Sequence, residues 1–376
     1  MIRLWFALVL ALAAPAAFAQ PPEAAPGLWT RADGRIGFTA ARISLALRAG
    51  AVEFRRTAEF SHQGEGLDSA LQYWSDDRQV FATVYVYYPG LAHAGLTAFA
   101  TDNAIQVQSG RNLRTLRSRL VAAGGREGMA IRADYAGFRD GMASSAAFIK
   151  AGRWIVKLRV SGPEARRAEV EGAMTALLDG LRFEGEIVPR PPAPLEVADC
   201  PAPSTARAGR RRDNEDDAPA ELLVGTMDGA GNEARREPEG RTEVLPPRFG
   251  SRWCLSTRAR IGDSVVPILR VDPGRPAETA IEGRSVVVAI LSDSGTVIEI
   301  VEALTPRRFI MLYHEIGGVS LLGAYDAPPS DEQIADIVSG ADREGQRIRA
   351  SARLRPNGNT EMEVPPPRAP AATPQT

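Results

Sequence analysis

The sequence is poor in lysine, histidine and cysteine. Lys150 and Lys157 are the only lysines among 45 basic residues, beside three histidines and two cysteines. The formal net charge of −1 argues against a nucleic-acid partner, which would require a broad basic field. The reliance on arginine fits either a bias in base composition or the use of guanidinium groups as forks for anions.

Recognisable catalytic and metal-binding motifs are also missing from the sequence. His62, His93 and His314 have no second histidine or cysteine at ligand spacing, so we expect no metal and no cofactor. Residues Gly318–Leu322 lack the final glycine of a nucleophile elbow. The acidic run Asp213–Asp217 lacks the spaced oxygens and central glycine of a calcium loop. We expect structural histidines and a solvated charge run.

The first residues form the one long apolar run. Met1-Ile2-Arg3 is a short positive start, Leu4–Ala14 is apolar, and Ala17-Phe18-Ala19 offers a cleavage site between small residues. This pattern predicts a secretory signal peptide over residues 1–19, cut near Ala19. The apolar run is too short for a permanent anchor. We therefore expect a periplasmic or secreted protein that is not integral to a membrane.

Export changes what the two cysteines predict. In an oxidising compartment an even pair is more often a disulfide than a pair of metal ligands. We therefore expect a bond between Cys200 and Cys254. A reactive thiol or a metal-binding role is the alternative.

Proline and charge divide the chain. A length of 376 residues suits two domains of ordinary size with connecting material. Residues 187–220 combine a proline-rich stretch with Arg210-Arg211-Arg212 and the acidic run that follows, so they predict a flexible linker. The sequence thus predicts an N-terminal domain over 28–183, a C-terminal domain over 221–355 and a disordered tail over 356–376.

The N-terminal domain is organised around a predicted central strand. Val80–Tyr88 is rich in β-favouring residues and follows an acidic turn, and Leu67–Trp74 before it predicts the partner strand of a hairpin. Its alternation puts small aliphatic side chains on one face and aromatic and hydroxyl side chains on the other. This aromatic group predicts a ligand groove, with ordinary packing as the alternative. The predicted groove residues are Tyr73, Trp74, Phe81, Tyr85 and Tyr87.

The pattern beyond this strand changes to a helical period. Between Leu96 and Ala123 the apolar residues recur at helical spacing, which predicts an amphipathic helix, bent near Gly110 and ended by Gly124-Gly125. No acidic residue occurs from Asn103 to Arg126, so the remaining helix surface is basic. We expect this surface to meet anionic lipid, lipopolysaccharide or an acidic polymer, with a solvated helix face as the alternative. Its predicted anion-binding residues are Arg111, Arg114, Arg117 and Arg119.

Three strand-like runs and a second helix complete this domain. Residues 128–136, 142–150 and 153–160 predict strands, and Ser161-Gly162-Pro163-Glu164 predicts a capping box that opens the helix. The order predicts an α+β fold, with an antiparallel sheet packed by one or two helices. In element order, residues 28–183 resemble the PsbP-like sandwich of lumenal and periplasmic accessory proteins. The resemblance has no signature motif and implies no site residues.

The C-terminal domain is predicted to have the same α+β composition. Its expected strands are 222–226, 252–261, 265–271, 284–292, 296–303, 307–314 and 319–325. A capping box at Ser330-Asp331-Glu332-Gln333 predicts a helix, and Gln346–Arg355 predicts a final edge strand with a charged face. Because both domains end in strands and a capped helix, a remote duplication is one hypothesis.

These patterns favour a non-enzymatic binding or accessory protein of the periplasm. Its expected partners are anionic envelope lipid, an envelope polymer or an envelope protein, and not nucleic acid. The alternative is a hydrolase whose carboxylates converge only in the fold, such as Asp76, Asp77 or Asp134. A purely structural envelope component is a third hypothesis.

Overall fold

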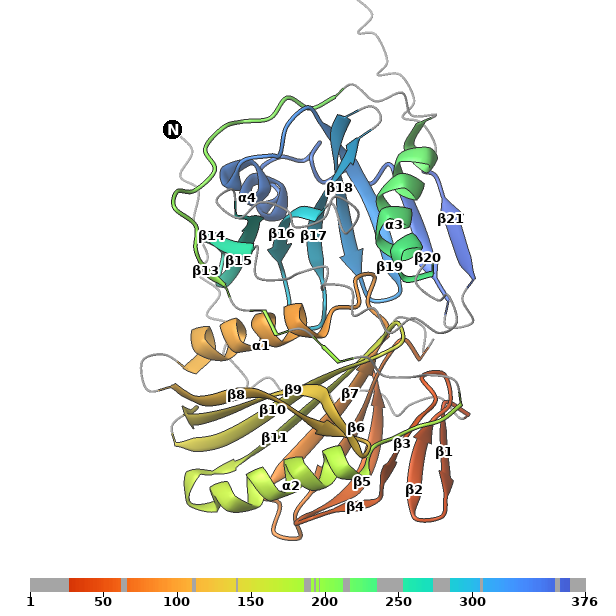
Figure 1. The fold of residues 1–376 in the computed structure, drawn as a ribbon, viewed down its shortest axis with the longest axis vertical. Coiled ribbons are helices and arrows are strands. Elements are labelled where there is room, and N and C mark those ends of the chain that lie inside the picture. The colour runs from red at the N-terminus through yellow and green to blue at the C-terminus, as the bar shows by residue number, and fades with distance from the viewer. Residues whose placement is uncertain are drawn as a thin grey trace, which may run out of the picture.

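The computed structural model describes most of the chain between residues 27 and 365 (Figure 1). The described ranges are 27–61, 66–109, 113–139, 141–185, 191–192, 194–195, 197–211, 217–234, 253–272, 285–304, 307–355 and 359–365. The predicted signal peptide, His62, Arg111 and most of the predicted tail lie outside them. No helix within these ranges is long and apolar enough to cross a membrane.

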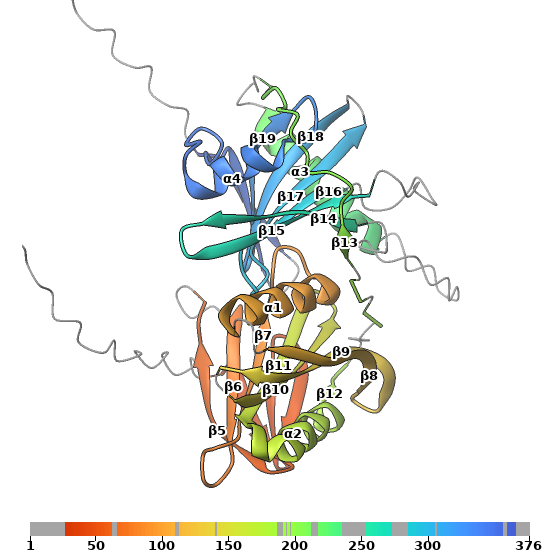
Figure 2. The same ribbon diagram turned by 90° about the vertical axis from the view of Figure 1, so that its left-hand side faces the viewer.

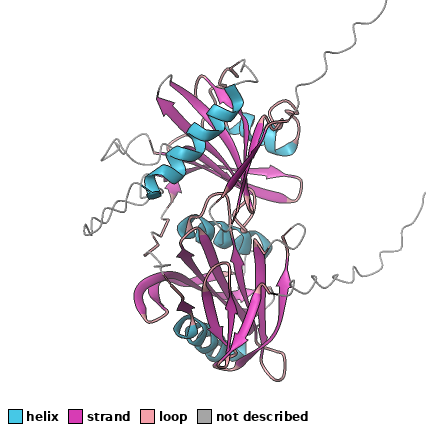
Figure 3. Ribbon diagram, turned by 90° about the vertical axis from the view of Figure 1, so that its right-hand side faces the viewer, coloured by secondary structure: helices cyan, strands magenta, loops and turns pink. Residues whose placement is uncertain are grey.

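The described residues form three sheets with helices packed on them, in agreement with the predicted α+β class (Figure 3). We refer to residues 27–185 as the N-terminal half and to residues 191–365 as the C-terminal half. The N-terminal half has an eight-stranded sheet and a four-stranded sheet, and the C-terminal half has a nine-stranded sheet. Among these described strands, every pair is antiparallel except β13 with β14.

The eight-stranded sheet has the order β4-β5-β6-β7-β11-β10-β9-β8. Its strands are β4 (Arg48–Ala49), β5 (Val52–Glu59), β6 (Asp68–Trp74), β7 (Phe81–Tyr87), β8 (Arg114–Ala123), β9 (Arg126–Phe138), β10 (Met142–Ala151) and β11 (Trp154–Pro163). The predicted hairpin of β6 and β7 is confirmed, with Trp74 opposite Phe81. The prediction that β7 is central is also confirmed, because it lies between β6 and β11.

The aliphatic face of β7 is buried beneath the helix α2 (Arg167–Gly180) and the four-stranded sheet. That small sheet consists of β1 (Trp29–Ala32), β2 (Arg35–Phe38), β3 (Ile43–Ala46) and β12 (Arg182–Phe183). The capping box predicted at Ser161 was wrong. Ser161 lies inside β11 and its hydroxyl contacts that of Ser144, while a short 3-10 turn (Glu164–Arg166) starts the helical segment. The Ser161 side chain, which was predicted to cap the helix, therefore interacts with the neighbouring strand β10 instead.

The helix predicted from Leu96 to Ala123 is correct only in its first part. α1 spans Ala94–Ser109, and β8 follows as an edge strand. The spacing of Leu113, Leu116 and Leu120 suits a helix, but Leu116 and Leu120 lie on the outermost strand, which hydrogen-bonds to β9, and Leu113 directly precedes it. The predicted basic helix face is therefore part of a sheet edge.

Helix α1 lies between the two halves of the chain (Figure 2). Ala94 and Ile105 pack on the aromatic side of the eight-stranded sheet, over β9 and β10. Leu96 and Ala100 instead pack against strands of the C-terminal half, including Trp253. Helix α1 therefore contributes side chains to one cluster in the N-terminal half and to another that includes strands of the C-terminal half.

Two glycines allow the backbones of the halves to meet. Gly90 donates its N–H to the Glu315 carbonyl at 2.8 Å, and Gly317 donates to the Tyr88 carbonyl at 2.7 Å. A Cβ on Gly90 would lie 2.3 Å from the Gly318 carbonyl oxygen, and one on Gly317 would lie 2.5 Å from a Leu67 methyl carbon. A larger residue at Gly90 would meet this backbone oxygen and push the halves apart. At Gly317 the Leu67 side chain could shift, but the positive φ of 67° favours glycine.

The nine-stranded sheet has the order β13-β14-β15-β16-β17-β18-β19-β20-β21. Its strands are β13 (Ala198–Asp199), β14 (Trp253–Ile261), β15 (Ser264–Val271), β16 (Ser285–Ile290), β17 (Val297–Leu304), β18 (Arg307–Glu315), β19 (Gly318–Tyr325), β20 (Ala350–Leu354) and β21 (Thr360–Glu363). The six strands predicted between residues 252 and 325 are all confirmed. The Ser330 capping box is confirmed in full at the start of α4 (Asp331–Ser339).

Three predictions for the C-terminal half were wrong. Leu222–Thr226 is part of the helix α3 (Ala218–Ala234), whose Leu222 is buried against the sheet. β20 is not an edge strand, because β21 pairs with it. β21 also lies inside the segment predicted to be a disordered tail. Contacts between segments distant in the sequence decide these structures. Leu222 of α3 packs against the sheet, and β20 and β21 hydrogen-bond to each other.

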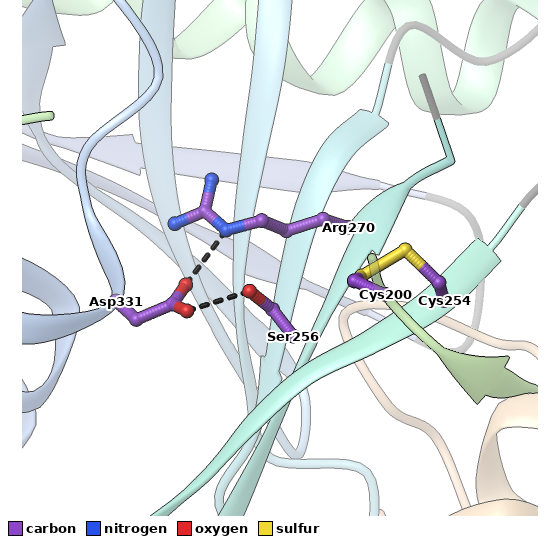
Figure 4. The surroundings of a disulfide bond; sticks show 5 residues. All are labelled: Cys200, Cys254, Ser256, Arg270 and Asp331. Carbon is purple, nitrogen blue, oxygen red and sulfur yellow. Dashed lines mark hydrogen bonds and ion pairs between the residues drawn. A yellow bond between two sulfur atoms is a disulfide. The ribbon is translucent and has the colours of Figure 1, made fainter. Parts of the chain in front are cut away.

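The predicted disulfide between Cys200 and Cys254 is present, with the Cα atoms 4.9 Å apart. Cys200 also donates its backbone N–H to the Leu255 carbonyl at 2.9 Å. Figure 4 shows the neighbouring ion pair of Arg270 with Asp331 at the start of α4, whose carboxylate also accepts a hydrogen bond from Ser256. This part of the predicted linker is therefore fastened to the C-terminal sheet.

Candidate ligand-binding face

The three described arginines of the predicted anion site lie on β8. Arg117 forms two internal ion pairs. Its guanidinium nitrogens lie 2.9 Å from the Asp134 carboxylate and 2.7 Å from the Glu171 carboxylate. Within the described ranges, Arg114 and Arg119 form no ion pair. The structure therefore places two of the four predicted arginines on the surface without an internal carboxylate partner, and Arg111 lies outside the described residues.

The carboxylates named for a hydrolase do not form a common site. Asp134 is buried and accepts hydrogen bonds from Arg132 and Ser145 at 3.0 and 2.6 Å in addition to Arg117. Burial raises the pKa of Asp134, but these donors and positive charges outweigh it and the pKa is lowered. Asp76 contacts Arg55, and Asp77 pairs with Arg166. Each of these acids therefore has a separate, structural partner.

The predicted aromatic group divides between the two faces of the sheet. Tyr73 is opposite Ala82, lies in the aliphatic core and donates to the Ala46 carbonyl at 3.1 Å. Tyr87 is buried on the other face, in the cluster beneath α1. Trp74, Phe81 and Tyr85 also lie on this second face. Tyr85 packs against the margin of that cluster, whereas Trp74 and Phe81 are not part of it. Phe81 is 38% exposed, and the other two are half-buried.

These three aromatic residues belong to a larger set of partly exposed side chains on β5, β6, β7 and β11. We call this set the aromatic–cationic face. Its members are Arg56, Gln72, Trp74, Phe81, Thr83, Tyr85 and Arg159. They are ordered in cross-strand rows because residues directly opposite in neighbouring strands share one side of a sheet.

The central row is polar and ends in an arginine on each side. It runs from Arg56 through Gln72 and Thr83 to Arg159. Arg56 donates to the Gln72 amide oxygen at 2.8 Å. Three steps between strands separate the arginine backbones by about 14 Å. A row with a cation at each end and polar side chains between them suits an elongated anionic ligand. The neighbouring rows supply the aromatic side chains, Trp74 and Phe81 on one side and Tyr85 on the other.

Arg159 is the more shielded cation of this row. Its guanidinium carbon lies 4.4 Å from the centre of the Phe138 ring. Burial lowers the pKa of Arg159, although the nearby Tyr85 and Asp293 oppose this effect. A guanidinium remains charged in proteins, so partial desolvation favours an anionic partner. In the described part of the chain, neither Arg56 nor Arg159 pairs with a carboxylate.

The aromatic–cationic face adjoins a charged contact between the halves. Lys157 of β11 is opposite Tyr85 and lies 2.5 Å from the carboxylate of Asp293, in the turn between β16 and β17. Burial lowers the pKa of Lys157, and the charge of Asp293 limits that decrease. Asp68 of β6 lies near the same lysine, and burial followed by the charge of Glu59 raises its pKa to about 6. This end of the face therefore holds a carboxyl that titrates close to neutrality.

Sequence reasoning missed Arg56, Lys157, Arg159 and Asp293. The alternation of Lys157 and Arg159 within a predicted strand was the available signal, because it places both side chains on one face. The local sequence does not show that Lys157 and Arg159 share a face with Tyr85, because this depends on the register of β11 with β7.

A buried polar cluster also lies in the C-terminal sheet. The His314 Nε2 atom lies 2.9 Å from the Glu299 carboxylate, to which Ser285 also donates. All three side chains are buried. The carboxylate lies between the serine and the histidine, so the histidine is not placed to take the serine proton. Among the described residues no group of three histidine, cysteine or acidic side chains is arranged to hold a metal ion.

Comparison with known proteins identifies no family model and no curated protein that matches the chain. One similar solved structure is cyanobacterial PsbP (CyanoP) from Synechocystis sp. PCC 6803, with 10% identity and a TM-score of 0.30, covering 40% of this chain and 91% of that one. A second, from Bacteroides thetaiotaomicron VPI-5482, has 10% identity and a TM-score of 0.21, covering 63% of this chain and 85% of that one. The chain thus bears a weak structural resemblance to PsbP, which carries no functional argument.

Proposed function

We propose that this protein is an exported, non-enzymatic binding or accessory protein that holds an elongated anionic ligand on its aromatic–cationic face. An anionic polymer or lipid of the cell envelope has the required chemistry. The observation that carries the proposal is the row from Arg56 to Arg159, because two cations that form no ion pair among the described residues flank polar and aromatic side chains.

Physical chemistry supports this use of the face. Hydrogen bonds between a guanidinium and an anion are stronger than neutral ones, and a partly buried guanidinium is screened less by salt. Half-buried rings such as Trp74 and Tyr85 offer apolar surface with a polar atom at one end. Together they suit a ligand that has both charge and an apolar or ring-shaped body.

The proposed location is the periplasm or the cell exterior. The sequence pattern of residues 1–19 predicts export, and the bond between Cys200 and Cys254 suits an oxidising compartment. A disulfide on the C-terminal half would form only after translocation.

Binding assays with two anionic probes test the proposal. Full-length mature protein is titrated with polygalacturonate and with phosphatidylglycerol vesicles, and with neutral dextran and phosphatidylcholine vesicles for comparison. We expect binding to one anionic probe and a decrease in affinity of about tenfold or more in R56Q and in R159Q, from the loss of a charge-assisted hydrogen bond. The probe that binds distinguishes a polymer from a lipid surface.

A matched control removes an arginine elsewhere. Arg260 is exposed on β14, so R260Q makes the same change of charge without touching the face. Equal loss of affinity in R260Q and R56Q would show that binding depends on overall charge alone and would contradict the proposal. Unchanged affinity in both R56Q and R159Q would contradict it as well.

A hydrolase is the second candidate function, and the surroundings of Lys157 favour it. Asp68 and Asp293 both interact with this lysine, and the pKa of Asp68 is about 6. General acid catalysis near neutral pH needs a carboxyl with a raised pKa and a second carboxylate nearby. A panel of ester, glycoside and peptide substrates tests this candidate. Activity that is retained in D68N would contradict it.

A further inference from the structure

The edge strand β8 has no partner on its outer side in the described part of the chain. It is the last strand of the eight-stranded sheet and pairs only with β9. Its residues from Arg114 to Leu120 are all exposed. A long exposed edge offers backbone N–H and C=O groups to another strand, and proteins ordinarily cover or shorten such edges.

Two irregularities define the regular part of this edge. The register with β9 shifts between Thr115 and Arg117, and again between Val121 and Ala123. The uninterrupted stretch is therefore Arg117–Val121, which pairs residue by residue with β9. Five residues are enough for a strand to be added by an extended peptide.

The two sides of this stretch differ in chemistry. Arg119 is opposite Arg132, whose guanidinium points toward α2 and donates to Thr175 at 3.0 Å. Leu120 is opposite Ile131, which lies in the cluster on the α1 side. Alternation along β8 therefore places arginines on the α2 side and Leu120 on the α1 side.

The α2 side has an excess of positive charge. Asp134 and Glu171 accept the ion pairs of Arg117, and Arg132 also pairs with Asp134. Arg114 and Arg119 have no such partner among the described residues. On the opposite side and in the bulge, Leu120 and Leu116 are 45% and 46% exposed. A strand that pairs with β8 would therefore complement both sides if its acidic residues faced the arginines and its alternate, apolar residues faced Leu120.

We propose that the β8 edge binds an extended segment of a partner protein in which acidic and apolar residues alternate, and that this segment adds as a ninth strand. The arginines of β8 repel an edge strand that is itself basic, and they attract a strand that carries acidic side chains. Main-chain hydrogen bonds supply affinity, and the alternating side chains supply specificity. The ligand proposed for the aromatic–cationic face plays no part in this contact.

The experiment uses a fluorescent peptide of four Glu-Val repeats and the full-length mature protein. We expect binding, no binding of a peptide of four Lys-Val repeats, and about tenfold weaker binding by the R114Q/R119Q variant at low salt. R260Q, which removes one positive charge away from β8, is the control and should bind as the unmodified protein does.

Two N-methylated versions of the peptide separate strand addition from simple charge attraction. A strand bonds its neighbour through alternate residues, so methylation of one alternate set should abolish binding and methylation of the other should leave it intact. Equal binding of both versions would overturn the proposal, as would the absence of binding by the unmodified peptide. If the R114Q/R119Q variant abolished vesicle binding or self-association and left peptide binding unchanged, that result would also overturn the proposal.

Discussion

Lys157 in β11 donates a hydrogen bond of 2.5 Å to the carboxylate of Asp293, and the pair joins the two halves of the chain. The lysine side chain is 8% exposed and that of the aspartate is 36% exposed. Burial lowers the pKa of the lysine, so the ammonium depends on its partner. The contact lies at the edge of the aromatic–cationic face, so it also fixes where the C-terminal half borders that face.

Loss of the aspartate should destabilise the protein more than loss of both charges. D293A leaves a buried ammonium without its partner, and we expect the free energy of unfolding to fall by about 2–3 kcal/mol, less than for a fully buried pair. The double variant K157M/D293A should recover part of this loss, because methionine fills similar space without charge. Urea denaturation at neutral pH measures both values. A D293A variant as stable as the unmodified protein would show that the pair contributes little.

The pKa of Asp68 predicts a pH dependence of stability. Its pKa of about 6 in the folded protein exceeds the ordinary value of 3.8 for an aspartate, so the folded state binds the proton more tightly. This contribution to stability is complete below pH 4 and is lost as the pH rises toward 6. We expect D68N to be more stable than the unmodified protein by about 1–2 kcal/mol at pH 7.5 and equally stable at pH 4. Denaturation at both pH values measures the difference, and D263N, in an exposed turn, is the control.

Removal of the disulfide should weaken the C-terminal half. The bond closes a separation of 54 residues, which the chain-entropy model values at about 4 kcal/mol. We expect C200S/C254S, or reduction of the unmodified protein, to lower the midpoint of urea unfolding. Binding of Glu-Val peptide at β8 below that midpoint should persist, since β8 belongs to the other sheet. A midpoint that is insensitive to reduction would contradict the prediction.

The capping box of α4 allows a smaller and more local test. The Ser330 hydroxyl accepts from the Gln333 N–H at 3.2 Å, and the Gln333 side chain accepts from the Ser330 N–H at 3.1 Å. We expect S330A to cost about 1–2 kcal/mol in thermal or urea unfolding, at the upper end because the residue is buried. S339A, at the exposed end of the same helix, should cost less.

Local patterns predicted most of the strands and the α4 helix. The alternation in Val80–Tyr88 identified β7 and its two faces, and Ser330 with Gln333 identified the start of a helix. These signals succeed because side-chain direction in a strand and the first hydrogen bonds of a helix depend on neighbours within a few residues. The Cys200–Cys254 bond was predictable for a different reason, because only one pairing of two cysteines exists.

Predictions failed where a distant segment decided the structure. Leu116 and Leu120 have helical spacing, yet pairing with β9 makes their segment a strand. Leu222 looked like part of a strand, but its burial against the C-terminal sheet is achieved by α3. β-Propensity and helix propensity differ by small free energies, so tertiary contacts override them at such positions.

The sequence by itself determined the α+β class, the period of most strands, the predicted export signal and the pairing of the cysteines. Only the tertiary structure decided that α1 is shared by both halves, that Tyr73 faces away from Tyr85, and that Arg56 and Arg159 end one row. The physical reason is that strand register and strand order depend on hydrogen bonds between residues far apart in the chain. A shift of one residue in that register would move every side chain of β11 to the other face.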